Sequence, residues 1–151
     1  MDTLEIKRKN LPHWRSSGVI YFVTWRLYRQ QELLRSEERE LVCRSLLHFD
    51  GERYLLGAYV VMDDHVHVIV VPLPENKLDE ILHSWRSFTA NQLQQNNTRT
   101  GKIWQEEPYD RIMRNLNEAK QKANYILDNP FRRWPELREY AFMGSGSLDW
   151  N

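Results

Sequence analysis

The chain has 151 residues, of which 41% are hydrophobic and 12% aromatic, enough to build one globular domain (residues 1–151) around its own core. Lys and Arg number 21 and Asp and Glu also number 21, so the formal net charge is zero, which argues against a protein that coats nucleic acid through bulk positive charge. The single cysteine, Cys43, excludes an internal disulfide and a multi-cysteine zinc site. No apolar stretch approaches the length of a membrane span and the first residues lack a signal-peptide pattern, so we expect a soluble cytoplasmic protein.

The alternation of β-branched and amphipathic segments predicts an α+β fold. A basic arm covers about residues 1–12. Strands are expected at 19–27, 53–62, 65–71 and 109–113, and helices at 36 to about 50, at 77–95 and from Asn117 to Pro130, where the proline should end the helix. The order β-α-β-β-α-β resembles a ferredoxin-like antiparallel sheet with an additional C-terminal helix. The helices should cover one face of this sheet and leave the other open to a ligand, and the fold alone leaves the function undecided.

Two histidines, His65 and His67, are the most informative feature of the chain. They alternate with Val66 inside the β-branched run 59–71, so both imidazoles project from one face of a strand. Two imidazoles at this spacing can close on one cation, with nitrogens about 2 Å from it. A solvent-facing or hydrogen-bonded histidine pair explains the same pattern, so the spacing alone does not decide between them.

A tyrosine and an asparagine lie four residues apart in the last expected helix. Tyr125 and Asn129 therefore share one helical face, about a turn from each other. Taken alone, Tyr125 is typical of a half-buried helix tyrosine, and Asn129 of the end of a helix before a proline. Neither residue indicates a catalytic or metal-binding role until it is considered together with the histidine pair.

The combination of these motifs is specific. His65-Val66-His67 after a Met-x-Asp step, together with Tyr125-Ile126-x-x-Asn129-Pro130, resembles the single-tyrosine transposases of the HUH (His-hydrophobic-His) nuclease superfamily, particularly the REP-associated tyrosine transposases. Supporting blocks occur in the same order at 11–14, 21–27, 85–90 and 104–114, so the resemblance covers about residues 10–135. Two segments depart from the family pattern: Asp63-Asp64 replaces a proline followed by Asn or Asp, and Phe131-Arg132-Arg133-Trp134 replaces a small, apolar continuation.

The resemblance implies a metal-dependent endonuclease and strand transferase that acts on single-stranded hairpin or repeat DNA in a bacterial cytoplasm. His65, His67 and Asn129 then correspond to the ligands of a divalent cation, and Tyr125 to the nucleophile that forms a 5′-phosphotyrosine intermediate. Two imidazoles and one amide carry no charge, so a bound cation keeps most of its Lewis acidity for the phosphate. A mixed nitrogen and oxygen ligand set is expected to accept Mn²⁺ or Mg²⁺.

DNA should reach such a site as a single strand or as a hairpin junction. Basic residues that are candidates for phosphate contacts, although a solvated surface explains them as well, are Arg86, Arg111, Arg114, Lys122, Arg132 and Arg133. Aromatic residues that could stack bases, although most suit a core, are Trp14, Trp25, Trp104 and Tyr109. Two other functions stay open: a non-catalytic or domesticated nucleic-acid-binding module, and a metal-dependent hydrolase in which Tyr125 only positions the substrate. The sequence also allows either a monomer or a homodimer that shares its active sites.

Overall fold

A computed structural model of the chain describes residues 18–96 and 99–149. The basic arm and the 11–14 block with Trp14 lie outside the described residues. The strands are β1 (Tyr21–Arg26), β2 (Tyr54–Val61), β3 (His65–Pro72), β4 (Tyr109–Ile112) and β5 (Met143–Ser145), and the helices are α2 (Ser36–His48), α3 (Leu78–Asn96) and α4 (Leu116–Arg133). None of these helices is long and apolar enough to cross a membrane.

The strands form one antiparallel sheet in the order β4-β1-β3-β2-β5. The first four strands have the ferredoxin-like arrangement, so the α+β fold expected from the sequence is confirmed. Strands β2 and β3 form a hairpin that turns at Asp63 and Asp64. Strand β3 lies at the centre of the sheet, with β1 on one side and β2 on the other, and seven of its eight residues are buried.

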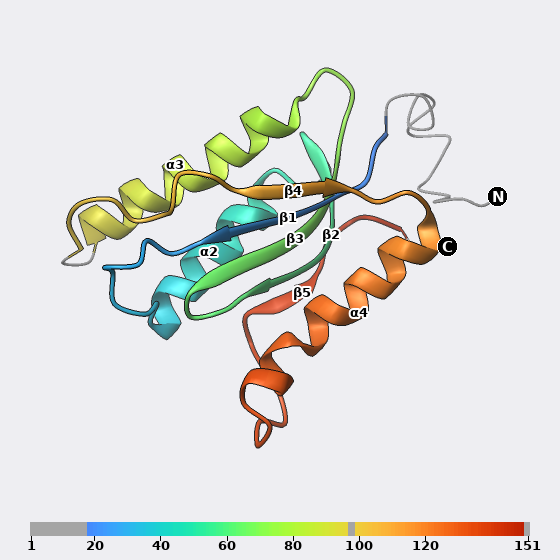
Figure 1. Ribbon diagram of the computed structural model, residues 1–151. Coiled ribbons are helices and arrows are strands. Elements are labelled where there is room, and N and C mark those ends of the chain that lie inside the picture. The colour runs from blue at the N-terminus through green and yellow to red at the C-terminus, as the bar shows by residue number, and fades with distance from the viewer. Residues whose placement is uncertain (1–17, 97–98, 150–151) are drawn as a thin grey trace.

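The two faces of the sheet carry separate hydrophobic cores. Helices α2 and α3 pack on one face, where Val66, Val68 and Val70 of β3 point. Helix α4 packs on the opposite face, where Ile69 and Val71 meet Ile126 and other apolar residues of the helix. Figure 1 shows the sheet between these two layers. Because side chains alternate along a strand, His65 and His67 belong to the α4 face.

The expectation that the second face would be open is therefore wrong for half of the sheet. Helix α4 packs mainly against β2 and also reaches β3. Its apolar side chains Ala119 and Ile126 are buried against the sheet, and such a stripe must be covered. On the β4 side the same face carries the exposed ring of Tyr109, opposite Thr24 in the β1–β4 register. The opening is thus narrower than expected and lies beside α4.

The last helix is also longer than the sequence predicted. It begins at Leu116, because Asn115 caps it by accepting a hydrogen bond from the backbone amide of Glu118, and it continues through Pro130 to Arg133. A proline in a helix costs one backbone hydrogen bond. Tertiary contacts offset that loss here, since Arg133 forms ion pairs with the β2–β3 turn and Trp134 stacks on Tyr140.

Strand β5 was not expected from the sequence. It is only three residues long and contains Gly144, so it shows no alternating pattern. Its position is fixed by pairing with the edge of β2 and by neighbouring hydrogen bonds, including that from the Tyr140 hydroxyl to the Val61 carbonyl, 2.6 Å. These contacts hold the chain beyond α4 against the sheet.

Candidate active site

The histidine pair lies at the start of β3, immediately after the hairpin turn. In the register between β1 and β3, His67 is opposite Thr24 and His65 is opposite Arg26. The two imidazole rings are 4.6 Å apart between centroids. Both residues are buried, with relative exposures of 8% for His65 and 6% for His67.

Each ring is oriented through its Nδ1 atom. His65 Nδ1 lies 2.7 Å from Asp64 Oδ1, and since a carboxylate only accepts, His65 must donate. His67 Nδ1 lies 2.7 Å from the hydroxyl of Thr24. Among the described residues, neither Nε2 atom has a hydrogen-bond partner, and both are left to bind a ligand. A hydrogen bond of this kind on the far nitrogen is typical of metal-binding histidines, because it fixes the tautomer and the ring plane.

The electrostatic environment keeps both imidazoles neutral. Burial is the main reason that the pKa of His67 falls to about 3, and the positive charges of Arg26 and Lys122 lower it further. Burial also lowers the pKa of His65, although the hydrogen bond with Asp64 acts in the opposite direction. A neutral imidazole presents a lone pair, which is the form that binds metals.

Tyr125 projects from α4 toward the histidine pair of its own chain. Its ring is 5.8 Å from the ring of His67, centroid to centroid, and it is 39% exposed. Together with Phe22, Thr24, Arg26, His67, Tyr109 and Lys122 it lines a hollow beside the helix. The structure therefore brings the predicted nucleophile and one predicted ligand to a single opening that solvent reaches.

Asn129 lies on α4 between two residues of the helix that contact β3 and the turn before it. Tyr125, Asn129 and Arg133 are spaced by four residues, so they form one stripe along the helix. At one end Tyr125 faces His67, and at the other Arg133 is paired with Asp63, 2.9 Å, and with Asp64, 3.6 Å. The half-buried Asn129 is at the middle of this stripe. Asp63-Asp64 and the segment with Arg133 are the two that depart from the family pattern, so these two segments contact each other.

Most of the predicted basic residues lie on α4 or beside its first turn. Lys122 Nζ is 4.8 Å and Arg132 Cζ is 4.4 Å from the centroid of the Tyr125 ring. Arg111 and Arg114 form ion pairs with Glu118 near the start of the helix. Arg86 lies apart from this group, on α3, where its guanidinium donates to the carbonyl of Glu106, 3.0 Å.

The aromatic candidates for base stacking divide in the same way. Trp25 and Trp104 are almost completely buried in the core under α2 and α3, whereas Tyr109 is 54% exposed at the hollow.

The sequence did not single out Thr24 and Arg26, because their position beside the histidines depends on the β1–β3 register. The alternation along β1 was the one available signal, since it places these two residues on one face.

The described residues contain no group of three His, Cys, Asp or Glu side chains able to hold a metal ion. A third protein ligand beside the histidine pair would therefore have to be a group of another type. An amide oxygen such as that of Asn129 meets this requirement, and the remaining coordination positions can be filled by water or substrate.

Comparison with known proteins identifies the family. Residues 16–127, which include the histidine pair and Tyr125, match the IS200-like transposases. The chain belongs to this transposase family. It is thus a member of a family of DNA-processing enzymes.

Solved structures show the same fold as this IS200-like transposase chain. A REP-associated tyrosine transposase bound to a REP hairpin matches with a TM-score of 0.66 and 18% identity, over 78% of this chain and 70% of that chain. A protein from Deinococcus radiodurans R1, provisionally assigned as a transposase, matches with a TM-score of 0.51 and 15% identity, over 72% of this chain and 88% of that chain. No curated protein matches the sequence.

The buried histidines of this transposase-family chain predict a pH-dependent stability. The pKa of His67 is about 3 in the folded chain and near 6.5 in the unfolded chain, so between these pH values the unfolded state binds the additional proton. Above pH 6.5 His67 is neutral in both states and does not change the free energy of unfolding. By pH 5, protonation of His67 in the unfolded state should have lowered that free energy by about 2 kcal/mol. Urea unfolding without divalent cations, carried out above pH 6.5 and at pH 5, measures this loss of stability. An equally large loss in His67→Leu would contradict the assignment.

Proposed function

We propose that this chain cleaves and rejoins single-stranded DNA, as a strand or at a hairpin junction, through a 5′-phosphotyrosine intermediate on Tyr125. The observation that carries the proposal is the position of the Tyr125 ring, 5.8 Å from His67 and at the same opening as the basic residues Arg26 and Lys122. A tyrosine with only a packing role needs neither solvent exposure nor a neutral imidazole and two basic side chains at the same opening.

The histidine pair fits a divalent cation, Mg²⁺ or Mn²⁺, held by His65, His67 and Asn129. Both imidazoles are neutral, their Nδ1 atoms are fixed by Asp64 and Thr24, and their Nε2 atoms have no other partner among the described side chains. Asn129 can add an uncharged amide oxygen. A cation bound there would supply positive charge that polarises a phosphate.

The residues around the hollow divide the reaction between them. Lys122 and Arg132 flank the Tyr125 ring, where they attract the scissile phosphate and stabilise the phenolate once its proton is lost. The phenolate oxygen forms a bond to phosphorus while the bond to the 3′ oxygen breaks, and that oxygen takes up a proton. The products are a 5′-phosphotyrosine and a free 3′ hydroxyl, and reversal of the step rejoins strands without ATP.

The remaining basic residues are assigned according to their surroundings. Arg111 and Arg114, near the start of α4, are candidates for contacts to the DNA backbone beyond the hollow, because their side chains stay 41% and 79% exposed despite their ion pairs with Glu118. We assign Arg133 a positioning role, because its guanidinium is already paired with Asp63 and Asp64. Arg86, on the other face of the sheet, is a candidate only for DNA that wraps around the protein.

Arg133→Ala should slow DNA cleavage by about 10- to 100-fold, because residues that orient ligand side chains typically contribute that much. The variant loses the ion pair between α4 and Asp64. Tyr125 should then be held less firmly in position, and the His65 ring less firmly in orientation. Arg138→Ala removes an exposed arginine just after the helix and is the matched control. Cleavage rates and Mn²⁺ affinity should both fall in Arg133→Ala. Weaker DNA binding with an unchanged rate at saturating DNA would instead indicate a phosphate contact.

The proposed function is tested by incubating the protein with Mn²⁺ and hairpin, single-stranded or duplex DNA. A protein-DNA adduct that survives denaturation should form with the hairpin or the single strand, and not with the duplex. Turnover without an adduct would favour a hydrolase. Binding without turnover would favour a non-catalytic module.

A further inference from the structure

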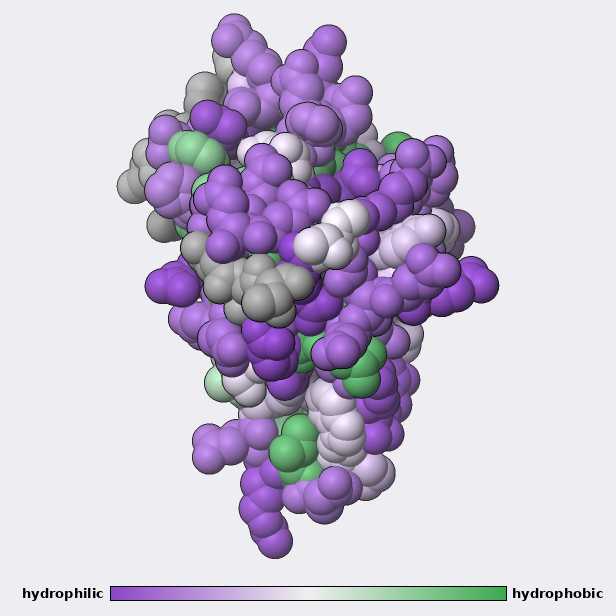
Figure 2. All heavy atoms as spheres, turned by 90° about the vertical axis from the view of Figure 1, so that its left-hand side faces the viewer, coloured by the Kyte–Doolittle hydropathy of each residue, from purple (hydrophilic) through white to green (hydrophobic). Residues whose placement is uncertain are grey.

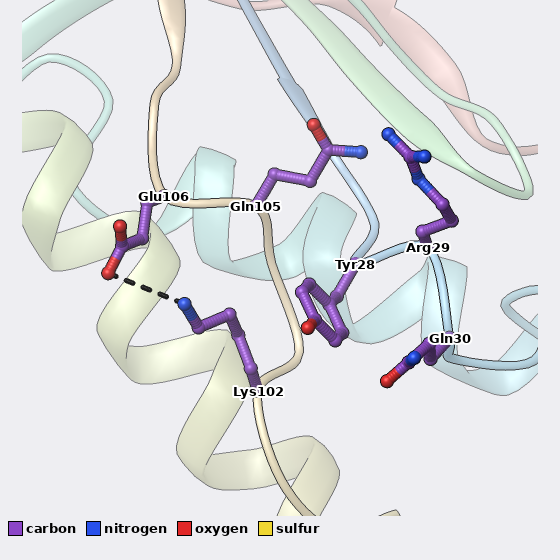
Figure 3. A pocket seen from close by; sticks show the side chains of 6 residues that line it. All are labelled: Tyr28, Arg29, Gln30, Lys102, Gln105 and Glu106. Carbon is purple, nitrogen blue, oxygen red and sulfur yellow. Dashed lines mark ion pairs between the residues drawn. The ribbon is translucent and has the colours of Figure 1, made fainter.

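A second hollow lies beyond the end of β1, outside the site described above. It is lined by residues of two loops, one following β1 and the other preceding β4: Tyr28, Arg29, Gln30, Lys102, Gln105 and Glu106. Figure 3 shows the Tyr28 ring between these loops, with the Lys102–Glu106 ion pair beside it. The ammonium group of Lys102 is 5.6 Å from the centroid of the Tyr28 ring.

The loops that form this hollow are held rigidly together. The backbone amide of Tyr28 donates to the Ile103 carbonyl, 2.7 Å, and that of Gln105 to the Arg26 carbonyl, 2.9 Å. Behind them, the almost completely buried Arg99 forms an ion pair with Glu38, 2.7 Å, and donates to the carbonyls of Glu32 and Leu33. A hollow built this way is preorganised and needs little rearrangement to accept a ligand.

The hollow continues the same row of side chains that leads from the histidine pair. Thr24 and Arg26 alternate along β1 on the α4 face, and Tyr28 comes next at the same spacing. Thr24 and Tyr28 are four positions apart in extended chain, a distance of about 13 Å. A DNA strand with its scissile phosphate at Tyr125 can therefore pass over Arg26 and reach Tyr28 within a few nucleotides.

Two side chains in the lining of the hollow offer hydrogen-bond acceptors to a ligand. Gln105 donates its amide nitrogen to the Leu27 carbonyl, 3.2 Å, which leaves its oxygen to accept a hydrogen bond. The Glu106 carboxylate is a second acceptor and is 77% exposed at its side chain. Two acceptors that line the same hollow as the Tyr28 ring match a base that stacks on the ring and donates from an exocyclic amino group, as adenine, cytosine and guanine do and thymine does not.

We propose that this hollow binds one unpaired nucleobase with an exocyclic amino group, within a few nucleotides of the cleaved phosphate. This inference rests on the proposed function and adds its sequence preference. Figure 2 shows the end of the molecule where these loops lie as a largely hydrophilic face with scattered apolar side chains, which suits a nucleic acid better than an apolar protein partner.

The first test uses the unmodified protein and a hairpin with a single-stranded extension, in which each nucleotide flanking the cleavage site is changed to thymine in turn. At one position, thymine should weaken binding by about tenfold in fluorescence anisotropy. Equal affinity at every position would overturn the proposal. A preference for thymine at the most sensitive position would do the same.

The second test compares Tyr28→Ala with Tyr28→Phe. The alanine variant loses the stacking surface and should bind about tenfold more weakly, with the preference at that position gone, whereas phenylalanine retains both. Both variants should still form the Tyr125 adduct at saturating DNA. Unchanged binding and base preference in Tyr28→Ala would refute the base site while leaving the proposed function intact. Failure of the unmodified protein to form any adduct would refute the proposed function itself.

Discussion

Tyr125→Phe should abolish the covalent protein-DNA adduct and reduce DNA cleavage by at least about a thousandfold, because no other group replaces a lost nucleophile efficiently. The ring is retained, so its packing 5.8 Å from His67 and the cations that flank it should be preserved. DNA binding and thermal stability should therefore change little. Denaturing gels of end-labelled hairpin DNA, incubated with the protein and Mn²⁺, measure adduct and cleavage together.

Tyr109→Phe is the matched control for this variant. Tyr109 lines the same hollow and is more exposed than Tyr125. If exposure alone made a tyrosine reactive, Tyr109 would be the better nucleophile. Adduct formation should nevertheless persist in Tyr109→Phe, because this residue lies on the edge strand β4 and not on α4. Loss of the adduct in Tyr109→Phe, with retention in Tyr125→Phe, would reverse the assignment.

His67→Ala should weaken Mn²⁺ binding by more than about 100-fold and reduce cleavage at least as strongly, since it removes one of two imidazoles from the site. His65→Ala should have a similar effect. Isothermal titration calorimetry with Mn²⁺ measures the affinity without DNA, so the result does not depend on catalysis.

Thr24→Val distinguishes the proposed metal site from simple burial of the histidines. It retains the shape of the side chain but removes the hydroxyl that lies 2.7 Å from His67 Nδ1. The affinity for Mn²⁺ should then fall by about 10- to 100-fold, an effect smaller than the loss of His67 itself. Wild-type affinity in His67→Ala would show that the histidine pair does not hold the cation.

The sequence predicted the sheet well because its strands carry local signals. A buried apolar run defines β2 and a β-branched run defines β3, and the alternation of His65 and His67 with Val66 places both imidazoles on one face. The structure confirms these features. The family assignment also follows from short motifs whose order along the chain is fixed.

The features that the sequence did not predict depend on contacts between distant segments. Helix α4 passes through Pro130 because Arg133 pairs with Asp63 and Asp64, about 70 residues earlier in the chain. Local propensity favours a break at that proline, and tertiary packing overrides it. The partnership of Thr24 with His67 likewise requires the register between β1 and β3.

The proposed reaction begins with the attack of Tyr125 on the scissile phosphate. It is tested most directly by trapping the adduct on a hairpin substrate, digesting the DNA and the protein, and locating the attached nucleotide by tandem mass spectrometry. The nucleotide should be found on the peptide that contains Tyr125, linked through the phenol oxygen to a 5′ phosphate. A nucleotide on Tyr109 or on another side chain, or cleavage with no protein-bound nucleotide, would contradict the account.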